Sequence, residues 1–60
     1  LLARFEKKAS AGGKHYFVLK AANHQVIGTS EQYPTEDARD NGIKSVMANA
    51  KLAGVEDRTA

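Results

Sequence analysis

A chain of sixty residues without a cysteine has few ways to build a stable fold. A domain this small buries only about 60% of the surface that its unfolded chain exposes, so it often needs a disulfide, a metal or a partner. Disulfides and thiolate metal sites are excluded because there is no cysteine. His15 and His24 are too far apart in sequence to form a typical metal-binding pair. We therefore expect one domain, residues 1–60, that has no metal or cofactor and gains burial by self-association.

Alternation of polar and apolar residues predicts three β-strands in the first half of the chain. Gly12-Gly13 supplies the turn between the first two, because glycine readily takes the positive φ that a hairpin turn requires. The expected strands span residues 2–8, 14–22 and 25–30.

The second hairpin carries Asn23-His24 where a tight turn usually has Asn-Gly. We expect these two residues to form the turn, since Asn tolerates the left-handed conformation well and His moderately. A two-residue turn sets Lys20 opposite Ile27. The core face of the two strands would then hold Phe17, Leu19, Ala21, Val26 and Gly28, with Leu19 opposite Gly28.

A helix with both ends marked is predicted after Pro34. Thr35 can cap it, and two acidic residues follow in the first turn, where the helix dipole favours them. Gly54 is the expected residue just beyond its C-terminus. One apolar stripe runs along the helix through Ile43, Val46, Met47 and Ala50.

Gly42 stands beside that stripe, and we expect it to let the helix approach the sheet closely near Gly28. The segment VEDRT, residues 55–59, is short and extended enough for a fourth strand. The predicted fold is α+β, in the order β-β-β-α-β, with an antiparallel sheet and one helix packed on one face.

Charge is distributed unevenly along the chain. Residues 1–34 carry five bases and two acids, a net charge of +3, whereas residues 35–60 carry four bases and five acids, a net charge of −1. The basic first half is consistent with an anionic partner or with an ordinary solvated face.

The outer face of the second and third strands is less polar than a solvated sheet surface usually is. It is either a contact surface or a consequence of β-propensity, since Tyr, Val, Ile and Thr are common in strands. The candidate binding residues are Tyr16, Val18, Lys20, Ile27 and Thr29.

Catalytic motifs are missing from the sequence. The glycines form neither a phosphate-binding loop nor a nucleophile elbow, and no spacing links a serine to a histidine, so we expect no enzyme. No apolar run is long enough to cross a bilayer and no secretory signal is recognisable, which together with the missing cysteines favours the cytoplasm.

Two separated motifs resemble a known family. The runs FVLKAANHQVIGTSEQY and NGIKSVMANA, with the closing VEDRT, are similar to the YegP-like family of small bacterial proteins of unknown function. The similarity extends from Phe5 to Thr59, although His24 replaces the usual turn glycine. The matching residues are Phe17, Leu19, Lys20, Ala21, Asn23, Ile27, Ser30, Glu31, Tyr33, Gly42, Ile43, Ser45, Val46, Asn49 and Ala50.

The resemblance implies a β3-α-β unit that works in pairs. In that family two units, either tandem repeats or two subunits, join into one sheet and exchange their last strands, so a single unit implies a homodimer. No activity is established for the family, and no catalytic residue is implied. We therefore expect a homodimeric scaffold or interaction module, the alternative being weak binding of nucleic acid or another polyanion by the outer sheet face.

Overall fold

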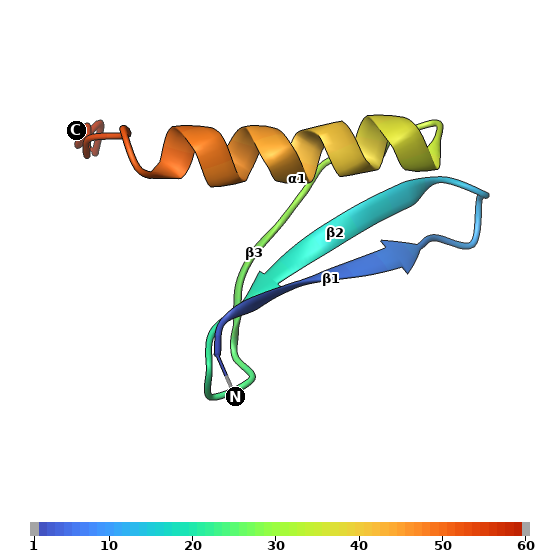
Figure 1. Cartoon of the computed structure of the whole chain (residues 1–60), viewed down its shortest axis with the longest axis horizontal. Helices are drawn as coiled ribbons and strands as arrows, with labels where there is room; N and C mark the ends of the chain where they lie inside the picture. The colour runs from blue at the N-terminus through green and yellow to red at the C-terminus, as the bar shows by residue number, and fades with distance from the viewer. Residues whose placement is uncertain (1, 60) are drawn as a thin grey trace.

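A computed structural model describes residues 2–59 and has the predicted α+β architecture. Three antiparallel strands form one sheet in the order β1-β2-β3, and the helix α1 lies across one face of it (Figure 1). The elements are β1 Arg4–Ala9, β2 His15–Lys20, β3 Val26–Thr29 and α1 Glu36–Ala50.

Both hairpins turn with the same geometry. The amide of Gly13 donates to the carbonyl of Ser10 at 3.1 Å, and the amide of His24 donates to the carbonyl of Ala21 at 3.0 Å. Gly13 and His24 both have positive φ, 78° and 71°. The amide of Ala21 closes the second loop by donating to the carbonyl of Gln25 at 2.8 Å. The second hairpin therefore has a three-residue loop that ends in a left-handed residue.

The prediction of a two-residue turn at Asn23-His24 is wrong for this reason. The longer loop preserves the expected pair of Leu19 with Gly28, but Lys20 pairs with Val26 instead of Ile27, and the register shifts there. Directly opposed residues share a face of the sheet, so Val26 lies on the face of Lys20. Val26 is 55% exposed, so the expectation that it belongs to the core is wrong.

The helix begins where the sequence predicts. Thr35 has extended backbone angles, and its hydroxyl accepts a hydrogen bond from the amide of Ala38 at 3.1 Å. It ends earlier than predicted, at Ala50 with Lys51 as the cap, so Gly54 does not terminate it. The last turns extend beyond the sheet, where no packing prolongs the helix (Figure 1).

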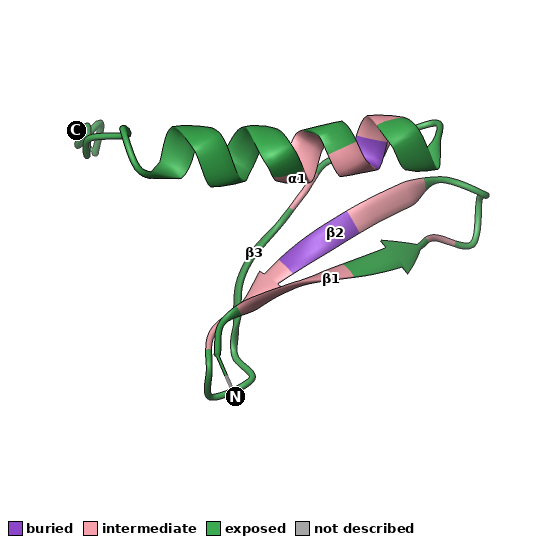
Figure 2. Cartoon of the chain, viewed as in Figure 1, coloured by how far each residue is buried: buried purple, intermediate pink, exposed green. Residues whose placement is uncertain are grey.

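The core is small and centres on β2 (Figure 2). Phe17 and Val18, each 5% exposed, are the buried apolar residues of the described chain. Phe17 meets Phe5 edge-on at a ring-centroid distance of 5.7 Å and stacks on Tyr33 at 6.2 Å. Such aromatic pairs stabilise a core beyond the area that they bury.

Gly42 approaches this aromatic group and not Gly28, which corrects the sequence-based expectation. A Cβ atom built on Gly42 would lie 2.5 Å from the Tyr33 hydroxyl and 3.2 Å from Cε2 of Phe17. Among residues 2–59, no atom lies within 4 Å of a Cβ built on Gly28. The glycine allows close contact between α1 and the aromatic residues beneath it.

Residues 55–59, expected as a fourth strand, have no regular secondary structure in this single chain. They continue beyond the end of α1, away from the sheet, and all of them are exposed (Figures 1 and 2). β3 consequently remains an edge strand.

Candidate functional site

Of the predicted binding residues, four lie on the face of the sheet opposite α1 but differ in accessibility: Tyr16, Val18, Lys20 and Thr29. Val18 is paired with Thr29 and is only 5% exposed, so it forms the floor of this face. Tyr16 and Lys20 are half-buried, whereas Thr29 is exposed. Ile27, at the register shift, is 63% exposed.

An ion-pair network around Glu6 covers the same face. The Glu6 carboxylate lies 2.8 Å from the Arg4 guanidinium, 3.3 Å from the Lys20 ammonium and 3.6 Å from the Lys8 ammonium. Partial desolvation alone would raise the pKa of Glu6, but hydrogen bonds from Lys20 and Arg4 hold that pKa below its ordinary value. Three bases therefore surround one carboxylate that stays ionised.

Lys20 was among the binding residues predicted from the sequence, but this network was not predicted. The alternation of charged residues in β1 was visible, but the register of β1 on β2 decides which of them meet. Arg4 pairs directly with Lys20, and Glu6 pairs with Val18. That register places Glu6 beside both Arg4 of its own strand and Lys20 of β2.

Arg4 has more donors than the structure satisfies. Its Nη2 lies 3.1 Å from Nδ1 of His24 at the tip of the second hairpin, and its Nε donates to Glu6 at 2.9 Å. Its Nη1 is buried and has no hydrogen-bond partner within residues 2–59. A buried guanidinium donor without an acceptor is costly.

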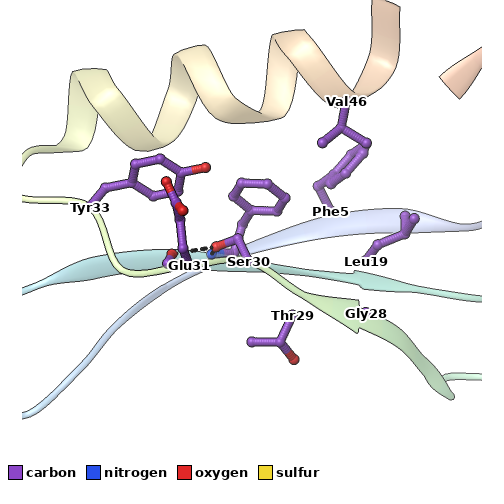
Figure 3. A pocket seen from close by; sticks show the side chains of 9 residues that line it. Phe5, Leu19, Gly28, Thr29, Ser30, Glu31, Tyr33 and Val46 are labelled. Atoms are coloured by element: carbon purple, nitrogen blue, oxygen red, sulfur yellow. Dashed lines mark hydrogen bonds between the residues drawn. The ribbon is translucent and has the colours of Figure 1, made fainter. Parts of the chain in front are cut away.

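A second feature lies on the other face, between the sheet and α1. It is an open hollow of about 500 Å³ beneath Val46 and beside β3. Figure 3 shows Phe5, Leu19 and Val46 around its apolar part, with Glu31 at its polar side. The hollow is wide and largely apolar, so it is suited to take up apolar side chains.

The polar rim of the hollow is tied to the backbone. The Ser30 hydroxyl accepts from the Phe17 amide at 2.9 Å and donates to the Glu31 carbonyl at 2.8 Å. The amide and carbonyl of Tyr33 then bond with those of His15, which carries the chain past β3 to the helix. These bonds hold the backbone around Glu31 in place, and Glu31 itself remains exposed.

A second group of ion pairs connects β1 to α1, away from both the Glu6 network and the hollow. Asp40 lies 3.2 Å from the Lys7 ammonium and 3.2 Å from Nε of Arg39, which also faces Glu36. Hydrogen bonds from Lys7 and Arg39, opposed by partial desolvation, hold the pKa of Asp40 below its ordinary value. Because Arg39 is only 7% exposed, these ion pairs are part of the packing between helix and sheet.

The described residues offer no metal centre. Within residues 2–59, no three His, Asp or Glu side chains come together as ligands for an ion. Over the same range, no helix has the length and apolar character that spanning a membrane demands.

The chain matches one protein-family model and several known proteins. The model, described as a domain of unknown function (DUF1508), matches residues 10–57. A UPF0339 protein of Shewanella oneidensis is 56% identical over 57 residues, which are 95% of this chain and 52% of that protein. The UPF0339 protein YegP of Escherichia coli is 54% identical over 56 residues, 93% of this chain and 51% of YegP. The chain thus spans about half the length of the curated relatives it matches.

Solved structures share the fold. The NMR structure of YegP from E. coli, described as a protein of unknown function, has a TM-score of 0.87 at 53% identity, covering 95% of this chain and 49% of that one. The NMR structure of a protein from Haloferax volcanii has a TM-score of 0.84 at 30% identity, covering 93% of this chain and 95% of that one.

Proposed function

The chain belongs to the DUF1508 family, and on that premise we propose that it acts as a self-associating structural module without catalytic chemistry. Two copies join across the open hollow, each placing its residues 55–59 beside β3 of the other. The observation that carries this proposal is an apolar hollow beside an edge strand, in a chain whose own C-terminal segment does not cover it.

Burial in a single copy supports the need for a partner. The apolar stripe on α1 is only partly covered, since Val46 is 37% exposed and Met47 is 56% exposed. The C-terminal residues Leu52 and Val55 are 85% and 100% exposed. Exposed apolar groups on this scale in a small domain favour association.

The C-terminal segment suits the hollow in length and apolar character. Five extended residues span about 16 Å, enough to run alongside the four residues of β3. An edge strand presents unpaired amides and carbonyls that a further strand can satisfy. Val55 matches the apolar lining around Val46.

Sedimentation velocity at micromolar concentration tests the proposal. We expect a dimer for the unchanged chain and monomers for Val46→Glu, which alters the hollow, and for Val55→Glu, which alters the segment. Leu2→Glu is the matched control because Leu2 is an 86% exposed residue outside the lining of the hollow, and it should stay dimeric. Thermal melts check that each variant is folded.

Mixing the two monomeric variants makes the test sharper. The Val46→Glu chain retains an intact segment, and the Val55→Glu chain retains an intact hollow, so one of the two contacts can form in a mixed pair. A heterodimer weaker than the unchanged dimer is the expected result. A monomeric unchanged chain, or dimers of both variants with unaltered affinity, would overturn the proposal.

A further inference from the structure

We propose that the sheet face opposite α1 binds single-stranded nucleic acid, with phosphates on Arg4, Lys8 and Lys20 and a base stacked on Tyr16. These residues lie on β1 and β2, away from the hollow that the self-association proposal uses. The two proposals therefore stand or fall separately.

This face of the sheet is positively charged. Arg4, Lys8 and Lys20 around Glu6 give a local excess of two positive charges, as large as the formal net charge of the whole chain, +2. Arg4 and Lys20 also stand directly opposite each other, a pairing of like charges that disfavours the sheet. A phosphate between them would relieve that repulsion more fully than Glu6 alone, which they share with Lys8.

The Arg4 guanidinium has a donor that a phosphate can satisfy. Nη1 of Arg4 is buried without a partner within residues 2–59, while the side chain as a whole is 32% exposed. The planar guanidinium can donate two parallel hydrogen bonds to phosphate oxygens. For Nη1 to reach a phosphate, the partly exposed Arg4 side chain must turn away from its contact with His24, and the phosphate then gives this donor an acceptor.

The position of Tyr16 decides the type of nucleic acid. Tyr16 pairs with Lys8, and it lies four residues along β2 from Lys20, about 13 Å. Val18, which is 5% exposed, lies between them. A tyrosine ring stacks on an unpaired base, and within residues 2–59 the helix α1 lies on the other face of the sheet and not on this one, so a single strand fits better.

Fluorescence anisotropy of a labelled oligothymidine, titrated with the full chain across a series of salt concentrations, tests the proposal. Binding should weaken as salt rises, because each neutralised phosphate releases counterions. Lys8→Gln and Lys20→Gln should each reduce the slope of log affinity against log salt by about 0.7. Lys44→Gln, which removes the same charge from α1, should leave the slope unchanged.

The aromatic contact has its own readout. Tyr16→Ser should weaken binding about 5-fold to 150-fold, whereas Tyr16→Phe, which keeps the ring, should retain affinity. The same titration with a duplex should give clearly weaker binding. Lys8→Gln keeps the test decisive if Lys20→Gln fails to fold, since Lys8 is the more exposed of the two lysines, at 41% against 22%.

Three results would overturn the proposal. They are the absence of binding at low salt, equal effects of Lys44→Gln and Lys8→Gln, and a duplex affinity that matches the single strand and does not respond to Tyr16→Ser. The last result would assign the face to polyanions in general. None of these results changes the sedimentation behaviour expected for self-association.

Discussion

Tyr33 stacks on Phe17 with ring centroids 6.2 Å apart and planes inclined by 11°, and its hydroxyl lies against Gly42 of α1. The two rings come from different segments, since Phe17 is central in β2 and Tyr33 stands just before the helix. The backbone bonds between His15 and Tyr33 fix the second ring in place. Because Gly42 has no side chain, α1 can pack directly against these two rings.

Gly42→Ala should therefore destabilise the protein. The added methyl would lie 2.5 Å from the Tyr33 hydroxyl and 2.9 Å from its Cζ, and the stacked ring cannot move freely. Overpacking costs about 1–3 kcal/mol, which outweighs the gain in helix propensity of up to about 1 kcal/mol. A lower midpoint of thermal unfolding, at fixed protein concentration, is expected.

Two further variants separate packing from propensity. Asn41→Ala changes an exposed neighbour in the same helix and should raise the midpoint slightly. Tyr33→Phe removes the atom nearest to the new methyl, so the cost of Gly42→Ala should shrink in that background. A higher midpoint for Gly42→Ala alone would contradict the close contact.

The sequence predicted the elements well but not all of their contacts. Thr35 as the cap, three strands and the α+β class are confirmed, because capping and alternation are local signals. The family resemblance, based on two separated motifs, is confirmed as well. The contact partner of Gly42 could not be predicted, since it depends on where Tyr33 packs after the chain leaves β3.

His24→Gly should stabilise the hairpin. His24 has a φ of 71°. In this left-handed conformation a residue with a Cβ atom is strained by up to about 1–2 kcal/mol, and glycine is free of this strain. Glycine loses more entropy on folding, about 0.5–1 kcal/mol, and also gives up the exposed contact of His24 with Arg4, so the expected net rise in the unfolding midpoint is modest. His24→Ala, which keeps a Cβ and loses the contact with Arg4, should lower the midpoint.

The same residue explains why the register was mispredicted. A two-residue turn and a three-residue loop differ by one position, and the choice depends on which residue takes positive φ. The loop places His24 there, and the shift moves Val26 out of the expected core. The Glu6 network was missed for a related reason, since it forms only when the register of β1 against β2 is known.

Acid should weaken the contact between β1 and α1 through Asp40. Its pKa in the folded chain lies below the ordinary value of about 4, so its contribution to stability is present above that value and is lost as pH falls through the folded pKa. Asp40→Asn should be less stable at neutral pH and should lose less stability on acidification than the unchanged chain. Urea unfolding at pH 7 and between pH 4 and about 2 measures both effects. An unaltered pH profile would contradict the role of the Lys7–Asp40 pair.

Val18→Ala should destabilise the protein although Val18 was predicted as a surface contact. Its side chain is 5% exposed between Glu6 and Thr29 of the neighbouring strands, so shortening it removes buried methyl groups from the floor of the outer face. At about 0.8 kcal/mol for each buried carbon group plus a cavity cost, the expected loss is about 2 kcal/mol. Ile27→Ala is the matched control, because Ile27 is 63% exposed and its truncation should change stability by less than about 0.5 kcal/mol. Denaturant unfolding at one protein concentration compares the two variants, and equal losses would mean that Val18 is as accessible as its neighbour and belongs with the contact residues after all.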